Sequence, residues 1–246
     1  MTIQFKDHFI NNRGVTIHCI ESVPTTDEIQ TNLSPLLISP GLSMRAEEYK
    51  DLMEQLSPRR CIALSFRGRG LSDTPAQGYA LEHHISDIVA VTKHLQLENF
   101  HLMAYSRGVS YALGYALRNR PPLRSIILQD YPAAHKQMSE EWAEDYIHNY
   151  LIPHHRIECI RVEAVHGIQR ESQEVEFWEE LHSIDVPVLV LRGATEEALI
   201  QDEHEQQYSK HLTNGKVVTF HRSGHDLHNT ERDKFIHTLQ AFLHAH

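Results

Sequence analysis

The chain has 246 residues, of which 41% are hydrophobic and 23% are charged, so it can bury a sizeable core and falls within the range of a single α/β domain. Its 23 Lys and Arg residues against 33 Asp and Glu residues give a formal net charge of −10, which argues against a nucleic-acid or anionic-membrane partner. The three cysteines, Cys19, Cys61 and Cys159, show no paired short spacing. A disulfide framework and a Cys-rich zinc site are therefore not expected, and a reducing cytoplasm is favoured.

Neither a secretory signal nor a membrane span is predicted. Lys6 and Asp7 precede any long apolar run, and nowhere do about eighteen apolar residues follow one another. The 20 histidines include adjacent pairs but no His-Glu-x-x-His spacing or Cys partner. Most of them are expected to be solvated or half-buried rather than metal ligands.

The predicted elements begin with a β-hairpin that turns at Asn11-Asn12-Arg13-Gly14. Apolar runs of strand length follow at 35–41, 60–66, 99–105, 123–130, 187–193 and 216–222. Amphipathic helices are predicted over 45–56, 81–96, 106–120, about 196–212 and 230–246. The alternation predicts an α/β fold with an open, mostly parallel sheet and helices on both faces, whose functional residues lie at the carboxyl ends of the strands.

Residues 132–182 interrupt this alternation and show no clear strand, so they are predicted to form a helical insertion. Ser139 is a candidate N-cap, followed by Glu140 and Glu141 in the first helical turn. Trp142, Tyr146 and Tyr150 recur every four residues as an aromatic stripe, which either packs the insertion onto the body or contacts a substrate. The domain prediction is a core of residues 1–131 and 183–246 with a cap of residues 132–182.

The sharpest motif is 99-NFHLMAYSRGVSYALGYAL-117, in which an apolar strand runs directly through Ser106 into a helix. This pattern is typical of a nucleophile elbow, a strained turn that exposes a serine hydroxyl above the sheet. Ala104 and Gly108 are the small neighbours that such crowding requires. The alternative interpretation is a serine that only caps the helix.

A serine nucleophile needs a histidine base and an acid that orients the histidine. His225 lies just after the last predicted strand, with Gly224 before it to let the loop turn. Glu196, in the loop after the penultimate strand, is the preferred acid. Glu197 and Asp130 are the competing carboxylates. The alternative interpretation of Asp130 is a carboxylate at the end of a strand that only accepts hydrogen bonds from nearby backbone N–H groups.

Two further groups bear on the chemistry of this site. His221, His225 and His228 could instead bind zinc. Such a site would need these residues to lie on a helix, and Ser223 and Gly224 disfavour a helix there. The backbone N–H groups of Leu42 and Arg107 are the candidate donors to an oxyanion, because Leu42 follows the first long strand and Arg107 follows Ser106.

These parts, in this order, resemble the α/β-hydrolase superfamily over nearly the whole chain. The stretch 60-RCIALSFRGRGLSDTP-75 also looks like that family's Arg-Gly-x-Gly-x-Ser loop. The resemblance implies Ser106 as nucleophile, Glu196 as acid, His225 as base, Leu42 and Arg107 as oxyanion donors, and 132–182 as the cap. Pro40, Ala104 and Glu196 depart from the usual His, Gly and Asp of the family.

The sequence therefore predicts a cofactor-free, metal-free serine hydrolase that cleaves a small carboxylic ester, lactone or thioester through an acyl-enzyme on Ser106. Cleavage of a carbon–carbon bond, another acyl transfer, or ligand binding without efficient turnover are the alternatives. The expected partner is a small-molecule acyl substrate. The candidate pocket residues are aromatic: Tyr105, Trp142, Tyr146, Tyr150, Phe177 and Trp178.

Overall fold

A single twisted sheet organises the chain in the computed structural model, which describes residues 3–24 and 32–246. Its eight strands lie in the order β1-β2-β4-β3-β5-β6-β9-β10. They are β1 (Ile3–Asn12), β2 (Val15–Pro24), β3 (Leu36–Ser39), β4 (Cys61–Ser65), β5 (Phe100–Tyr105), β6 (Leu123–Gln129), β9 (Val188–Gly193) and β10 (Gly215–Phe220). The pairs from β4 to β10 are parallel, whereas β1 pairs with β2, and β2 with β4, in the antiparallel sense. The predicted α/β class and the predicted hairpin are confirmed.

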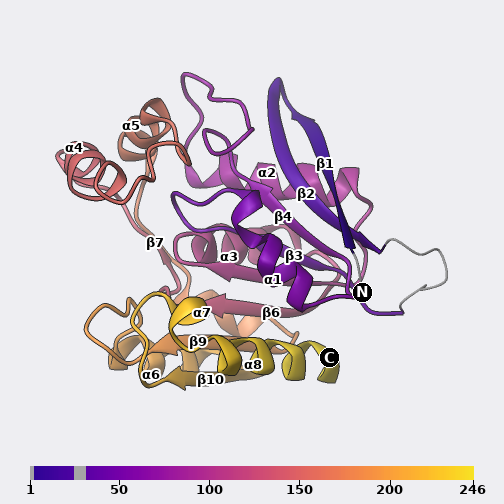
Figure 1. Cartoon of the computed structure of the whole chain (residues 1–246). Coiled ribbons are helices and arrows are strands. Elements are labelled where there is room, and N and C mark those ends of the chain that lie inside the picture. Colours follow the sequence, from indigo (N-terminus) through magenta and orange to yellow (C-terminus); the bar gives the residue numbers. More distant parts are fainter. Residues whose placement is uncertain (1–2, 25–31) are drawn as a thin grey trace.

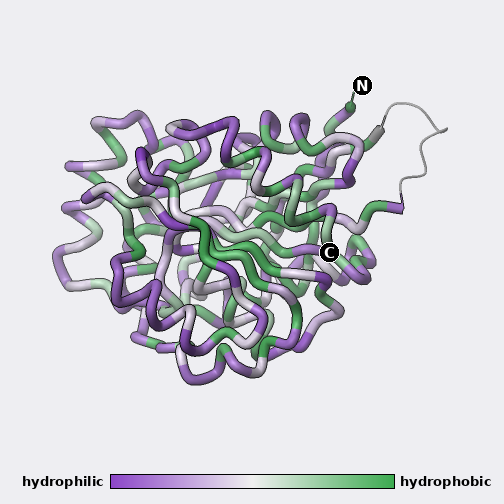
Figure 2. The backbone as a smooth tube through the Cα atoms, turned by 90° about the horizontal axis from the view of Figure 1, so that it is seen from below, coloured by the Kyte–Doolittle hydropathy of each residue, from purple (hydrophilic) through white to green (hydrophobic). Residues whose placement is uncertain are grey.

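Helices bury both faces of this sheet. One face packs against α2 (Leu81–His94), α3 (Gly108–Asn119) and α6 (Asp202–His211), and the other against η1 (Ala46–Tyr49), α1 (Lys50–Gln55) and α8 (Arg232–Ala245). The short helix α7 (Leu227–Thr230) precedes α8. Figure 2 shows the hydrophobic strands running through the middle of the molecule and hydrophilic segments around them, as expected when a parallel sheet is covered on both faces. No helix in the described part of the chain has the length and apolar character needed to cross a membrane.

The segment 132–182, here called the cap segment, is mainly helical but does contain strands. The two-residue strands β7 (Ala134–His135) and β8 (Val175–Glu176) pair antiparallel at its base. Between them lie α4 (Trp142–Tyr146), η2 (Ile147–Leu151) and α5 (Val162–Glu171), and η3 (Trp178–Ser183) follows. The helices α4, η2 and α5 share a small apolar cluster with Tyr79 of the core, whereas η3 packs on the main core. The expectation that this segment carries no strand is therefore wrong in detail.

Ser139 is not the N-cap of the first cap helix. The helix begins at Trp142, Glu141 occupies the N-cap position, and no side chain caps it. The backbone carbonyl of Ser139 instead accepts a hydrogen bond from the Trp142 amide at 3.2 Å. The main chain thus satisfies the amide that the Ser139 hydroxyl was expected to serve.

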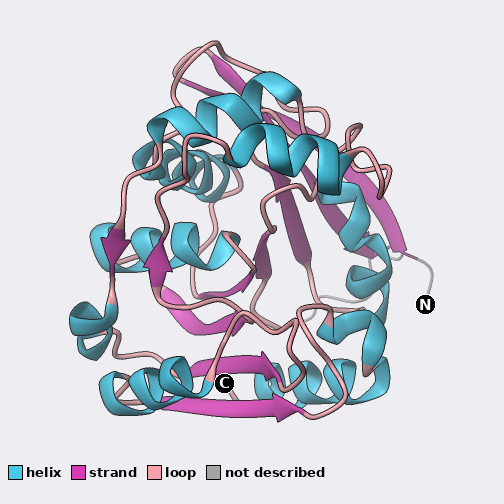
Figure 3. Cartoon of the chain, turned by 90° about the vertical axis from the view of Figure 1, so that its left-hand side faces the viewer, coloured by secondary structure: helices cyan, strands magenta, loops and turns pink. Residues whose placement is uncertain are grey.

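The cap segment lies at the end of the sheet where a site was expected. In Figure 1, α4 and α5 lie on the left, on the side towards which the arrows of β6 and β10 point, and both chain ends lie on the right. Figure 3 views the molecule from that left-hand side, with helices arranged around the strand ends. Residues that directly follow β5, β6, β9 and β10 therefore meet at one edge of the sheet.

Candidate active site

Ser106 lies at a sharp turn between β5 and α3. Its φ is 53°, in the left-handed region that a serine adopts only under constraint. The constraint is the close approach of the helix start to the β3 loop: a Cβ at Gly108 would lie 2.3 Å from the Pro40 carbonyl oxygen and 2.4 Å from that of Ser39. Ser106 itself is half-buried. The strand, strained serine and obligatory small residue are those of a nucleophile elbow.

His225 is held by a carboxylate, and that carboxylate belongs to Asp130. The His225 Nδ1 lies 2.8 Å from Asp130 Oδ2, and the His225 side chain remains partly exposed. The imidazole also stacks on Tyr105, the residue before Ser106, with ring centroids 4.8 Å apart. Ser106 Oγ makes no hydrogen bond to another group among the described residues, as is common in unliganded hydrolytic sites.

The expectation that Glu196 orients His225 is corrected by this geometry. Glu196 and Glu197 are both exposed, and within residues 3–24 and 32–246 neither makes a hydrogen bond to His225. Asp130 is fully buried directly after β6, with a φ of 45°. Asp130, one of the two competing carboxylates, is therefore the partner of His225.

The loop around Glu196 has a different task from the one predicted. Its backbone amides converge on Asp130, whose carboxylate accepts hydrogen bonds from Leu199 N at 2.9 Å, Ile200 N at 3.2 Å and Gly193 N at 3.4 Å. Three amides and one imidazole satisfy the buried carboxylate and hold it aimed at His225. Residues 196–201 consequently form a loop, and the helix predicted from about 196 begins at Asp202.

The two amides expected to bind an oxyanion lie beside Ser106 without acceptors of their own. Arg107 directly follows Ser106, and a Cβ at Gly41, the residue before Leu42, would lie 3.2 Å from Ser106 Cβ. Neither the Leu42 nor the Arg107 amide donates a hydrogen bond to another group within residues 3–24 and 32–246. Unpaired N–H groups beside a nucleophile are what a developing oxyanion needs.

The loop after β3 that carries the Leu42 amide is held in place from two sides. On the core side, Arg69 Nε donates to the Leu42 carbonyl at 3.0 Å. On the cap side, Tyr146 Oη donates to Ser43 Oγ at 2.9 Å, and Arg156 Nη2 donates to the Ser43 carbonyl at 2.7 Å. Burial raises the pKa of Tyr146 to about 12, so its hydroxyl keeps the proton that it donates. The position of the Leu42 amide thus depends on the cap segment.

The predicted pocket aromatics divide into two groups. Trp142, Tyr146 and Tyr150 stack in succession in the cap segment, with ring centroids 5.1 and 5.0 Å apart, and Tyr105 covers His225. Trp178 instead packs against Tyr208 and His204 of α6, and Phe177 is buried in the core. The prediction that Trp178 and Phe177 line the pocket is therefore wrong, because η3 folds them back onto the body.

The rival zinc interpretation finds no geometric basis. Across residues 3–24 and 32–246, no three His, Cys, Asp or Glu side chains come together as a metal site. His221 is exposed, and His228 faces Asp51 and Arg232 rather than His225. The three histidines do not converge.

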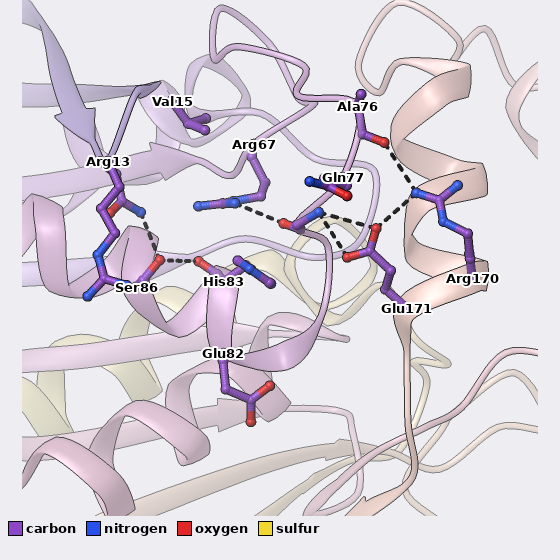
Figure 4. A pocket seen from close by; sticks show the side chains of 12 residues that line it. Arg13, Val15, Arg67, Ala76, Gln77, Glu82, His83, Ser86, Arg170 and Glu171 are labelled. Carbon is purple, nitrogen blue, oxygen red and sulfur yellow. Dashed lines mark hydrogen bonds and ion pairs between the residues drawn. The ribbon is translucent and has the colours of Figure 1, made fainter.

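A surface hollow of about 820 Å³, which Ser106 does not line, lies between the first hairpin turn, the start of α2 and the end of α5 (Figure 4). Two of its charged side chains are already paired. Arg67 binds Asp87 and the Gly78 carbonyl, and Glu171 accepts from the Gly78 and Tyr79 amides. We therefore place the chemistry at Ser106 and not in this hollow.

A family model described as the alpha/beta hydrolase fold matches residues 34–151. The esterase of Exiguobacterium antarcticum superposes with a TM-score of 0.77 at 20% identity, over 96% of this chain and 98% of the esterase. The chain therefore has the α/β-hydrolase fold. Among curated relatives, AB hydrolase superfamily protein YisY of Bacillus subtilis is 23% identical over 85% of this chain and 91% of its own length. N-formylmaleamate deformylase of Pseudomonas putida is 31% identical over 40% of this chain and 38% of its own length.

Proposed function

We propose that this protein of the α/β-hydrolase fold is a serine hydrolase that cleaves a small carboxylic ester, lactone or thioester through an acyl-enzyme on Ser106. The observation that carries the proposal is the grouping of a strained Ser106 with the His225–Asp130 pair, bridged by the Tyr105 ring. Two acceptor-free amides beside the serine support it. None of these residues requires a metal or an organic cofactor.

In the proposed reaction, His225 Nε2 removes the proton from Ser106 Oγ as the oxygen attacks the acyl carbon. The carbonyl oxygen becomes an oxyanion, which the Leu42 and Arg107 amides stabilise, and loss of one such donor typically raises a barrier by about 3 to 4 kcal/mol. The imidazolium, stabilised by Asp130, returns its proton to the leaving oxygen or sulfur. Water then gives a proton to His225 and its hydroxide to the acyl group, which releases the acid and restores Ser106.

A fluorophosphonate probe tests the proposal directly. We expect one adduct on the folded protein, located at Ser106 by peptide mass spectrometry, and no adduct on Ser106→Ala. A urea-unfolded sample serves as the control, because an ordinary serine hydroxyl is not nucleophilic near neutral pH. Folded wild type that stays unlabelled, or that carries the adduct on another serine, would overturn the proposal.

Hydrolysis of an amide-type bond is the second candidate, and the relative named N-formylmaleamate deformylase favours including it. The same nucleophile and oxyanion amides serve acyl groups with different leaving atoms. Matched aryl ester, thioester, lactone and N-formyl substrates, together with a vinylogous diketone for carbon–carbon cleavage, separate the candidates by kcat/KM. The substrate class with the highest kcat/KM, lost in Ser106→Ala, identifies the leaving group.

A further inference from the structure

Two buried guanidinium groups belong to residues next to the oxyanion amides, since Arg69 contacts the Leu42 carbonyl and Arg107 directly follows Ser106, and neither is paired with a carboxylate. Arg69 is 1% exposed and Arg107 is 2% exposed. No Asp or Glu oxygen of the described residues lies within ion-pair distance of either side chain. The neighbouring Arg67 shows the contrast, because it is paired with the buried Asp87 at 2.7 Å.

Arg69 has an unused hydrogen-bond donor. Its Nε donates to the Leu42 carbonyl at 3.0 Å, and its Nη1 donates to the Arg67 carbonyl at 2.7 Å and contacts His84 Nε2 at 3.0 Å. Its Nη2 is buried and has no partner. Burial lowers the pKa of the Arg69 guanidinium, and the nearby charge of Asp87 acts in the opposite direction.

Arg107 is surrounded by neutral groups. Its Nη2 donates to Ser172 Oγ at 2.7 Å and to the Lys136 carbonyl at 3.0 Å, both in the cap segment. The same nitrogen contacts His135 Nε2 at 3.1 Å. Burial and the Arg107 charge lower the pKa of His135 to about 2, so this imidazole is neutral and acts as an acceptor. The Arg107 cation therefore has dipoles around it but no counterion.

The two arginines are linked through two stacked aromatic side chains, Tyr111 and His84. Tyr111 Oη accepts from Arg107 Nε at 3.2 Å. The Tyr111 ring also stacks on His84, with ring centroids 4.2 Å apart, and His84 in turn contacts Arg69. Both cations thus belong to one buried group between the oxyanion amides and the cap segment.

A buried cation without an anion destabilises the fold, so its retention calls for a compensating charge. The nearby carboxylates are already committed, Asp87 to Arg67 and Asp130 to His225. The remaining source of a negative charge at this place is the bound ligand. Guanidinium groups are well suited to binding a negatively charged ligand, since their planar N–H donors match the geometry of a carboxylate.

We propose that the substrate carries a carboxylate, which Arg69 and Arg107 bind beside the oxyanion amides while its acyl carbon faces Ser106. This inference rests on the proposed hydrolase function and adds the substrate class. Arg69 supplies its unpartnered Nη2, and Arg107 supplies the second positive charge. Both act as binding residues that set specificity, and the Arg107 amide keeps its separate part in stabilising the oxyanion.

A matched ester pair tests the proposal. p-Nitrophenyl hemisuccinate has a free carboxylate, and methyl p-nitrophenyl succinate is its neutral counterpart with the same leaving group. We expect wild type to favour the hemisuccinate in kcat/KM by about tenfold or more, the value of a charge-assisted hydrogen bond. Equal rates, or a preference for the neutral ester, would overturn the assignment of a carboxylate.

The ratio of the two rates also identifies the residues. In Arg69→Gln and Arg107→Met the ratio should fall towards one, whereas damage to the fold or to the oxyanion amides lowers both rates and leaves the ratio intact. Arg170→Gln is the charge-matched control, because Arg170 is exposed at the end of α5, and it should keep the wild-type ratio. A wild-type ratio in both test variants would overturn the assignment of these arginines.

Binding without turnover separates this inference from the hydrolase function. On a Ser106→Ala background, calorimetry should show tighter binding of the hemisuccinate than of the methyl ester, and Arg69→Gln should remove the difference. Discrimination in binding, with no hydrolysis of either ester by wild type, would refute the hydrolase function and retain the carboxylate site. Equal affinities would refute the site.

Discussion

Two residues at the strand ends adopt the left-handed conformation at the places where chemistry is proposed. Ser106 follows β5 with a φ of 53°, and Asp130 follows the neighbouring strand β6 with a φ of 45°. Such conformations are destabilising by about 1 to 3 kcal/mol each and persist only where the surroundings enforce them. Here the crowding at Gly108 and the three amides around Asp130 do so. The strain turns one side chain above the sheet edge and the other towards His225.

At this scale, Asp130→Asn is expected to slow acylation by about 10³- to 10⁴-fold, because an amide favours the wrong His225 tautomer and cannot stabilise the imidazolium. Burst kinetics with p-nitrophenyl butyrate measure the effect. Glu196→Gln, the matched change on an exposed carboxylate, should acylate at close to the wild-type rate. A large loss of acylation rate in Glu196→Gln with little loss in Asp130→Asn would show that Glu196 is the acid.

Among the elements, the cap segment is tied to the loop that carries the Leu42 amide. Arg156 bridges the two, since it donates to the Ser43 carbonyl and pairs with Glu48 at the start of η1. Tyr146 makes a second connection through the Ser43 hydroxyl. Because Ser43 directly follows Leu42, a shift of the cap segment moves an oxyanion donor. The cap segment therefore helps to position the loop that carries the proposed oxyanion donor.

We expect Arg156→Gln to lower kcat for p-nitrophenyl butyrate several-fold, with kcat/KM falling in proportion, because an oxyanion contact is made only in the transition state. Thermal stability should change little, since a partly exposed ion pair contributes about 0 to 1 kcal/mol. Arg156→Lys, which keeps the charge, should recover part of the rate. A lower melting temperature with unchanged kcat would show that Arg156 is only structural.

For the whole molecule, buried histidines make stability depend on pH. Burial lowers the pKa of His101 to about 4 and that of His135 to about 2, and it lowers that of His84 well below the usual range. In the unfolded chain each binds a proton near pH 6.5, so the unfolded state holds more protons below that pH. Stability is therefore complete above about pH 7 and decreases as the pH falls, down to about pH 4 for His101 and further for His135.

Each such histidine should lower the free energy of unfolding by about 2 kcal/mol between pH 7 and pH 5. Urea unfolding of His101→Asn at both values should show a pH dependence smaller than wild type by about that amount. Ser125→Ala, which removes the hydroxyl 2.8 Å from His101 Nδ1, is the control and should shift stability equally at both values. An unchanged pH dependence in His101→Asn would contradict the assignment.

Much of the fold could be predicted because its signals are local. Each predicted strand appears within a few residues, from β3 at Leu36–Ser39 to β10 at Gly215–Phe220, since buried parallel strands need continuous apolar runs. The errors also have local causes. The helix start was misplaced at Ser139 because the main chain satisfied the amide that a side chain was expected to serve, and Trp178 folded onto α6 through contacts distant in sequence.

The sequence by itself determined the elbow, because a strand, a serine and a crowded glycine are consecutive and their geometry is fixed by neighbours. It also placed His225 correctly, at the edge of the sheet where the carboxyl ends of the parallel strands lie. It did not choose between Asp130 and Glu196, because β6 and β9 are adjacent and in register, Gln129 beside Leu191, so both strands end at the same place. Only the tertiary structure decided, by directing the amides of the 193–200 loop onto Asp130 and by enclosing Arg69 and Arg107 without a counterion.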